Sequence, residues 1–290
     1  MQQIENNYLK VQIAEKGAEM QSIFSKDTGT EYLWNADPKF WSKKSPVLFP
    51  IVGGLKNNSY TYDGKSYTMG RHGFARDMEF SVNMPPRENS IEYLLQSNET
   101  TLEKYPFRFR FSVCYVLTGS KITITYIVEN KDEKEMFFSV GAHPAFKVPI
   151  IEGTNFEDYY LLFDKTERAE RWPLSSEGLI ELKPEPFLND TDKLPLKKEL
   201  FYKDALVFKH LNSSAISIKS DKTERGLTVA FEGFPYMGIW SAKDAAFLCI
   251  EPWQGIADSV SATGKLQEKE GIVSLGVGKT FKAGWSIELF

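Results

Sequence analysis

The chain has 290 residues, of which 42% are hydrophobic and 14% aromatic, and its formal net charge is −4. The aromatic surplus favours strands over helices, and the interspersed charges form no basic patch, which excludes nucleic acid as a partner. There is no run of about 18 apolar residues and no apolar leader, so we expect neither a membrane span nor secretion. Cys114 and Cys249 lie in apolar strand-like runs, which predicts reduced, buried thiols and a cytoplasmic location.

The first strands are marked by period-two patterning. Apolar residues alternate with Lys10 and Gln12 across residues 9–13, which predicts a strand. Two more short strands are expected around a turn at residues 26–29. An Asp-Gly pair at the centre of residues 62–65, between alternating aromatic residues, predicts a hairpin.

A block rich in charge and histidine occupies residues 70–80, where a buried strand would not place so many polar groups. In one interpretation Arg76 belongs to an ion-paired surface corner and is held by Asp77 or Glu79. In the other, its guanidinium lines a pocket that receives an oxygen-rich ligand. We favour the pocket, because a second corner that combines histidine with glycine occurs at His143.

The clearest strand pattern begins at Phe107. Residues 107–117 and 122–128 each place apolar side chains on one face, which predicts a long antiparallel hairpin. Residues 150–200 are rich in proline and lack a helical period, so long loops with short strands are expected there. Further strands are expected at residues 205–208, 216–218, 227–231, 239–240, 247–251 and 285–290.

These patterns predict an all-β protein with a large antiparallel architecture. The chain contains no internal repeat of fixed period and no linker composition. A chain of this length is often a single domain when it is all-β. We therefore expect one domain over residues 1–290.

The stretch FFSVGAHPAF places a histidine where a strand ends. A strand-like run reaches Gly141 and Ala142, and His143 is followed directly by Pro144. Proline interrupts a sheet ladder and keeps the residue before it extended, so the imidazole should be fixed at the end of the strand. The small residues before it leave room for another group to approach the backbone. A purely structural histidine is the alternative.

Glu251 has a similar position near the C-terminus. It ends the apolar run Phe247 to Ile250 and is followed by Pro252 and Trp253. A charge placed there must be paired, hydrogen-bonded or functional, unless it is an exposed strand terminus. A histidine and a glutamate, with reference pKa values of about 6.5 and about 4.3, supply a general acid and a general base near neutrality.

The sequence lacks the motifs of metal sites, serine hydrolases and phosphate-binding loops. His210 follows an ordinary strand and is interpreted as structural. Neither HxH nor HExxH occurs, so no metal is expected. The nucleophile elbow of Ser-His-Asp hydrolases is missing, and Gly53-Gly54 lacks the lysine of a phosphate-binding loop. No cofactor is therefore expected.

Four motifs together resemble the aldose 1-epimerase (galactose mutarotase) family. They are HGFAR at 72–76, GAHP at 141–144, YKD at 202–204 and IEPW at 250–253. The resemblance runs over nearly the whole chain. It is closest to the branch associated with bacterial lactose and galactose operons, beside the glucose-6-phosphate 1-epimerase-like proteins. It implies an antiparallel β-supersandwich of the galactose mutarotase type.

The resemblance also implies roles for particular residues. Glu251 would take the proton from the anomeric hydroxyl, and His143 would protonate the ring oxygen. His72 would hydrogen-bond the sugar and Arg76 would position that corner, while Asp204 aligns with a sugar-binding aspartate. Trp253 offers a flat apolar surface on which a sugar could stack.

One departure concerns the residue after Gly53. Relatives usually carry arginine there, before Leu-Lys, whereas this chain has Gly54. The missing guanidinium removes a contact to substrate oxygens.

The function implied is the interconversion of the α and β anomers of a hexose or hexose phosphate, an isomerase reaction that needs no metal and no nucleotide. The partner would be a small sugar. A non-catalytic sugar-binding or sensing protein is the main alternative, because a fold does not determine a function. An enzyme acting on polysaccharides is a third, since large β-sandwiches serve that role too.

Overall fold

The fold consists mostly of antiparallel strands, as the sequence predicted. The computed structural model describes the backbone of residues 1–290 and every side chain except those of residues 84–86. The described helices are α1 (Glu99–Lys104) and the 3₁₀ turns η1 (Lys56–Asn58), η2 (Ala75–Asp77), η3 (Phe156–Asp158), η4 (Lys198–Phe201) and η5 (Leu266–Glu268). In the part of the chain that is described, no helix is long and apolar enough to cross a membrane.

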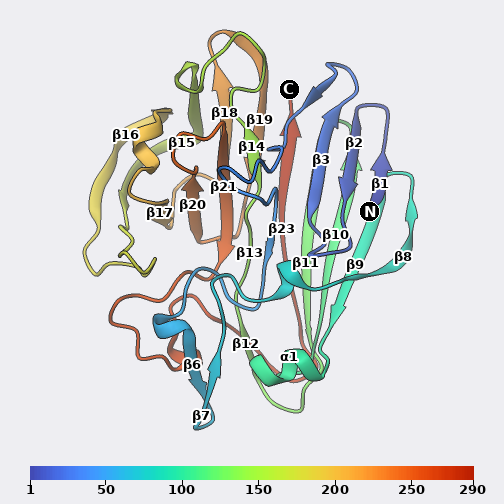
Figure 1. The fold of residues 1–290 in the computed structure, drawn as a ribbon, viewed down its shortest axis with the longest axis vertical. Coiled ribbons are helices and arrows are strands. Elements are labelled where there is room, and N and C mark those ends of the chain that lie inside the picture. Colours follow the sequence, from blue (N-terminus) through green and yellow to red (C-terminus); the bar gives the residue numbers. More distant parts are fainter.

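The largest sheet has nine strands (Figure 1). In spatial order they are β16 (Glu185–Pro195), β15 (Tyr159–Arg171), β18 (Ala215–Ser220), β19 (Thr223–Ala230), β23 (Thr280–Leu289), β11 (Lys121–Asn130), β10 (Phe109–Thr118), β9 (Ser90–Gln96) and β8 (Ser81–Arg87). The hairpin predicted over residues 107–128 is the β10–β11 pair, in which Phe111 lies opposite Val128. Both side chains are fully buried, which confirms the apolar face.

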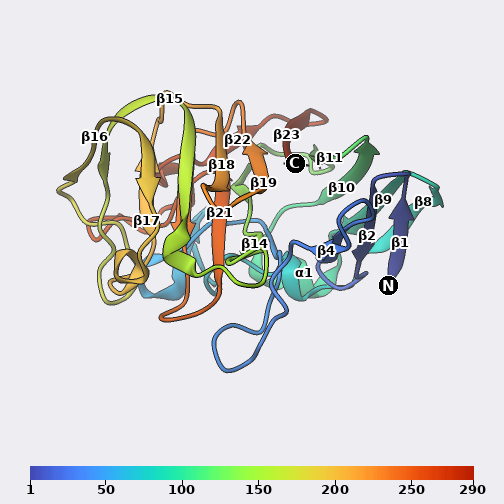
Figure 2. The same ribbon diagram turned by 90° about the horizontal axis from the view of Figure 1, so that it is seen from above.

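A second sheet of six strands lies near the middle of the molecule in both views (Figures 1 and 2). Its strands are β17 (Leu206–Lys209), β20 (Tyr236–Trp240), β21 (Phe247–Gln254), β13 (Val140–Ala142) and β5 (Val47–Leu48), with β14 (Ala145–Lys147) also paired to β21.

Smaller sheets complete the fold. A four-stranded sheet contains β1 (Gln2–Glu5), β2 (Leu9–Ile13), β3 (Met20–Ser25) and β4 (Thr30–Glu31), and two pairs are β6 (Ser59–Tyr62) with β7 (Lys65–Thr68) and β12 (Met136–Phe138) with β22 (Val273–Leu275). β2 and the β6–β7 hairpin were predicted. The hairpin turns at Asp63 and Gly64, both with positive φ, which is why an Asp-Gly pair is required.

Strand β21 separates the main core from a second face. Leu248 and Ile250 point into the large apolar cluster between the sheets. Cys249 and Trp253 belong to two smaller clusters on the opposite face. Since side chains alternate along a strand, Glu251 lies on that same face, between them.

The expectation of long loops over residues 150–200 is wrong. Strand β15 has thirteen residues and β16 has eleven, and the two pair with register shifts between Leu162 and Glu170. These irregularities break the period-two pattern that would have revealed the strands. The prolines of β16 are tolerated because that strand is the edge of its sheet.

The expected strand end at Glu251 is also wrong, because β21 continues through Pro252 to Gln254. The neighbouring strand is interrupted between β13 and β14, next to this point. A proline is tolerated in a sheet where the adjacent ladder is broken. His143, by contrast, does follow directly after a strand, as predicted.

Candidate active site

Strand pairing places His143 beside Glu251. β13 and β14 both pair with β21, with Gly141 opposite Trp253 and Ala145 opposite Cys249. The two registers agree, so His143, in the gap between these strands, falls opposite Glu251. Its Nε2 atom is 3.3 Å from Oε2 of Glu251. The structure therefore brings together the two residues that the sequence marked as acid and base.

Both side chains are buried, with exposed fractions of 10% for His143 and 2% for Glu251. Even so, Nδ1 of His143 and Oε2 of Glu251 have no hydrogen-bond partner among the described residues. Buried polar atoms are nearly always satisfied in folded proteins. Unsatisfied atoms on this face therefore indicate a place where a polar ligand binds.

Burial moves the pKa of each member of this pair toward its neutral form. It lowers the pKa of His143 to about 3, and the charges of Arg76 and Arg71 contribute in the same direction. Burial, reinforced by the charge of Asp204, raises the pKa of Glu251 well above its ordinary value. In a close pair the proton belongs to both groups. Both shifts therefore favour a state in which imidazole and carboxyl together carry one exchangeable proton.

His72 approaches the pair from a turn ahead of η2. Its φ is +69°, and Gly73 follows with φ +71°. A Cβ at Gly73 would lie 2.3 Å from the carbonyl oxygen of Phe49, so only glycine fits there. The ring of His72 meets that of His143 edge-on, with centroids 5.5 Å apart. The tight turn at His72 and Gly73 thus places the imidazole of His72 beside that of His143.

The backbone fixes the tautomer of His72. The Gly53 N–H donates to Nδ1 of His72 at 3.1 Å, and the His72 N–H donates to the Gly53 carbonyl at 2.9 Å. Burial and the neighbouring His143 lower the pKa of His72 well below its ordinary value. The ring is therefore neutral, with its proton on Nε2, and can donate a hydrogen bond.

All six residues predicted for the site line one pocket of about 820 Å³. They are Glu251, His143, His72, Arg76, Asp204 and Trp253. They come from strands and turns that are far apart in sequence, so the fold, not local spacing, assembles them. His210 does not line this pocket.

The indole of Trp253 lies flat against the neighbouring strands. A Cβ at Gly238 would be 2.4 Å from the indole, and one at Gly141 would be 2.7 Å from it. Glycine in both strands makes the space that the indole fills. The room predicted before His143 is therefore used by Trp253.

Arg76 makes the contacts of both interpretations, because it is paired at a surface corner and is also part of the pocket wall. Its Nε atom is 3.6 Å from Oδ2 of Asp77, and its Nη2 atom donates to the carbonyl oxygen of Arg71 at 3.0 Å. It also lines the pocket. Asp204 reaches the pocket from a backbone with φ +104°, and its Oδ1 accepts the N–H of Ala205.

Two tryptophans that the sequence did not single out enclose the imidazole of His143. Trp41 stacks on it with centroids 4.8 Å apart, and Trp240 meets it edge-on at 5.6 Å. Trp41 belongs to the loop between β4 and β5, which projects from the sheets (Figure 2). No local pattern identifies these contacts, because one partner lies in a loop and the other in an ordinary strand.

Arg71 also lines the pocket and was missed as a site residue. Its Nη2 atom donates to the carbonyl of Glu177 at 3.2 Å. Gly178, with φ +75°, packs against this guanidinium, and a Cβ there would force the arginine side chain to move. Gly54 borders the same segment, and a Cβ there would meet only ordinary contacts, the nearest 3.8 Å away.

A possible ligand set for a metal also lies here. One donor atom each from His143, Cys249 and Glu251 lies within 4.8 Å of the others. Zinc accepts all three ligand types. Burial raises the pKa of the Cys249 thiol well above its ordinary value, so the thiol is neutral without a metal. The expectation of no metal rested on local spacing and stays a prediction.

Comparisons with known proteins agree with this geometry. The sequence profile of the family described as Aldose 1-epimerase matches residues 1–270. The chromosomal protein LacX of Lactococcus lactis subsp. lactis is 36% identical over 298 aligned positions, which cover 99% of this chain and 98% of LacX.

Solved structures give the same assignment. A galactose mutarotase related enzyme from Lactobacillus acidophilus superposes with a TM-score of 0.95 at 39% identity, covering 100% of this chain and 97% of that one. A galactose mutarotase-like protein from Lactobacillus casei gives 0.94 at 31% identity, covering 100% of both chains. These relatives share the galactose mutarotase-like fold, and this chain belongs to the aldose 1-epimerase family.

Proposed function

We propose that this protein is an aldose 1-epimerase that interconverts the α and β anomers of a hexose or hexose phosphate by acid–base ring opening. The observation that carries the proposal is a buried imidazole and a buried carboxyl 3.3 Å apart in a pocket of about 820 Å³. A pocket of that size accommodates a monosaccharide. Membership of the family supports a sugar as the ligand.

The reaction needs one base and one acid. Glu251 removes the proton from the anomeric hydroxyl while His143 donates one to the ring oxygen, and the C1–O5 bond breaks to give the open aldehyde. Rotation about C1–C2 and the reverse transfers close the ring on the other face. Each well-placed transfer contributes about 10²–10⁴ in rate.

The single proton held by the pair matches this cycle. In the form that opens the ring, the proton sits on His143 and Glu251 is ionised. After ring opening Glu251 carries the proton taken from the sugar and His143 is neutral. Both distributions have the same net charge, so the buried site accommodates the whole cycle without gaining or losing charge.

The remaining residues hold the sugar in this proposal. Nε2–H of His72 donates to a sugar oxygen and stabilises the charge that develops there. Arg76 and Asp204 bind hydroxyl groups at the pocket wall, and the indole of Trp253 stacks on the apolar face of the ring.

Polarimetry tests the proposed function. Freshly dissolved α-glucose, α-galactose and their 6-phosphates are followed with and without the purified protein. At least one of these sugars should reach its equilibrium rotation faster with the protein, in proportion to protein concentration. Unchanged rates for all four would contradict the proposal and would favour the sensing alternative.

A specific observation supports that alternative. The resemblance to the family implies an arginine after Gly53, and this chain has Gly54 there, so one expected contact to the substrate is missing. A protein that binds a sugar without converting it would tolerate such a loss more easily than an enzyme would. In the enzyme, the same loss predicts a high KM for simple hexoses.

Gly54→Arg should therefore tighten binding. Charge-assisted hydrogen bonds are worth roughly 1.5–3 kcal/mol, which corresponds to a KM lower by about tenfold or more. The backbone allows the change, because a Cβ at Gly54 meets nothing closer than 3.8 Å. KM is measured for glucose and galactose in the variant and in Gly54→Ala, which adds the Cβ without the charge. Equal KM values in the two variants would dismiss the role of the missing guanidinium.

A strong chelator should leave the rate of anomer exchange and the melting temperature unchanged. The proposed steps are proton transfers that need no Lewis acid. The measurement includes metal analysis of the dialysed protein before and after chelation. Activity that disappears with the metal and returns when Zn²⁺ is added would instead assign a functional ion to His143, Cys249 and Glu251.

A further inference from the structure

Behind the pocket lies a buried ion pair that the proposed reaction does not use. Nζ of Lys269 is 2.9 Å from Oδ1 of Asp258, and the side chains are 2% and 4% exposed. Such a pair is weak evidence for stability, because removing two charges from water offsets much of their attraction. Its position in the fold therefore needs another explanation.

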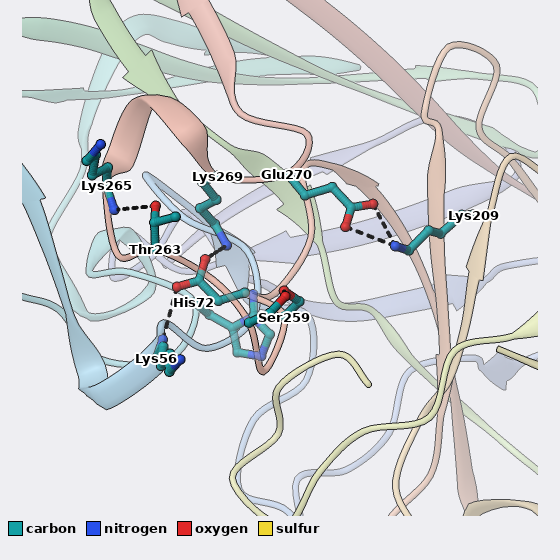
Figure 3. A network of polar contacts seen from close by, with 11 residues as sticks. Lys56, His72, Lys209, Ser259, Thr263, Lys265, Lys269 and Glu270 are labelled. Atoms are coloured by element: carbon teal, nitrogen blue, oxygen red, sulfur yellow. Dashed lines mark hydrogen bonds and ion pairs between the residues drawn. The ribbon is translucent and has the colours of Figure 1, made fainter. Parts of the chain in front are cut away.

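Asp258 connects separate segments through every polar group it has. Its Oδ2 accepts the N–H of Lys56 at 3.0 Å, and its own N–H donates to the carbonyl of Gly54 at 2.9 Å. Its carbonyl accepts the N–H of Ile180, also at 2.9 Å. Figure 3 shows Lys56 and Lys269 converging on one carboxylate. Two walls of the pocket are thus fastened to one residue.

The first of these walls, residues 53–56, holds the imidazole of His72. Asp258 hydrogen-bonds this wall at Gly54 and at Lys56. Gly53 packs closely on Ala257, since a Cβ added to Gly53 would lie 2.4 Å from the Ala257 Cβ. The N–H of Gly53 is the donor that keeps Nδ1 of His72 unprotonated. A shift of residues 53–56 would remove that donor and free the imidazole to change tautomer.

The second wall carries the contact of Arg71. Ile180 is hydrogen-bonded to Asp258 and to Val260, and it follows the segment whose Glu177 carbonyl accepts from Arg71. The main-chain carbonyl of Asp258 therefore also holds the segment on which a pocket guanidinium rests.

We propose that Asp258 and Lys269 are positioning residues, whose buried ion pair fixes residues 53–56 and so keeps the proton of His72 on Nε2, facing the pocket. Lys269 orients the carboxylate through Oδ1, and Oδ2 is then aimed at the Lys56 N–H. The inference rests on the proposed function for its kinetic consequence only. The tautomer of His72 can be observed without any sugar.

The test uses the double variant Asp258→Ala with Lys269→Met, which removes both buried charges and the side-chain oxygen that accepts the Lys56 N–H. The full-length protein is labelled with ¹⁵N-histidine. It contains three histidines, and a His72→Gln spectrum assigns the ring nitrogens of His72. In the wild type, His72 should show one protonated Nε2 and one bare Nδ1. In the double variant, its two nitrogens should move toward the average of both tautomers.

The kinetic arm measures kcat/KM for the best sugar found by polarimetry. A misplaced donor typically costs up to about 10²-fold, and we expect a loss of about tenfold or more. Lys265→Met is the matched control, because its ion pair with Glu268 is exposed, at 61% and 47%, and lies close by in sequence. That control should change neither the His72 spectrum nor kcat/KM.

A second variant keeps the test decisive if the double variant does not fold. Lys56→Pro removes the N–H that Asp258 accepts and leaves the ion pair in place, at the first residue of η1, where proline is tolerated after the extended Leu55. Lys56→Ala, which keeps the N–H but loses the lysine side chain, is its control. Lys56→Pro should shift the His72 signals in the same direction. A folded variant that melts at a lower temperature but keeps the wild-type His72 spectrum would overturn the proposal, because it would make the pair purely structural. If no sugar is converted by the wild type, the proposed function fails while the ¹⁵N result still decides this inference.

Discussion

Glu251→Gln should lower the rate of anomer exchange at least about a hundredfold, because an amide cannot accept the proton of the anomeric hydroxyl. The fold should survive the change. Burial raises the pKa of Glu251 well above its ordinary value, so the surroundings of this side chain favour a neutral group such as glutamine. The measurement is the exchange rate at saturating sugar, together with circular dichroism and the melting temperature.

Glu167→Gln is the matched control for this experiment. Glu167 is also buried, at 1% exposed, and its carboxylate accepts the N–H groups of Asn212 and Ser213. It does not line the pocket, so its variant should exchange anomers within about twofold of the wild-type rate, whatever it loses in stability. Near-wild-type exchange in folded Glu251→Gln would remove Glu251 from the mechanism.

His143→Asn should lower the exchange rate by at least about a hundredfold as well. Asparagine keeps a polar group in the gap between β13 and β14 but cannot carry a proton to the ring oxygen. The variant is assayed beside Glu251→Gln, and the double variant should be little worse than either single one, since the two residues act as a unit. Losses that simply multiply in the double variant would contradict a concerted acid–base pair.

The same variant has a signature in the pH dependence of stability. Burial lowers the pKa of His143 to about 3, from 6.5. Between these values the unfolded chain binds a proton that the folded protein does not, so wild-type stability falls as the pH drops through this window. Without His143 this part of the slope should vanish in urea unfolding. Glu251, with its raised pKa, acts in the opposite sense, because its share of stability is lost as the pH rises above its unfolded value.

The fold was predictable where the strands alternate cleanly. Residues 9–13 and the β10–β11 hairpin expose one face and bury the other, so their period is visible in the sequence. The β15–β16 pair was missed because its bulges shift the register, and those shifts depend on partners outside the local window. The continuation of β21 through Pro252 was missed for the same reason, since the break that tolerates it lies in another strand.

The site was predictable at residues whose chemistry is unusual for their position. A histidine before proline and a glutamate after an apolar run stand out in any sequence, and the family motifs added His72, Arg76 and Asp204. Trp41, Trp240 and Asp258 were missed because their importance lies only in what they contact. Neither a tryptophan nor an aspartate in a loop carries a local sign of the imidazole or backbone that it contacts.

Exchange NMR on an equilibrated sugar mixture tests the central claim most directly. With the protein present, saturating the anomeric proton signal of one anomer should reduce the signal of the other, at a rate proportional to protein concentration and abolished by Glu251→Gln. This result requires conversion, because binding alone cannot transfer saturation between anomers. Line broadening or transfer from protein to sugar, without faster transfer between the anomers of any hexose or hexose phosphate, would contradict an epimerase and identify a sugar-binding protein.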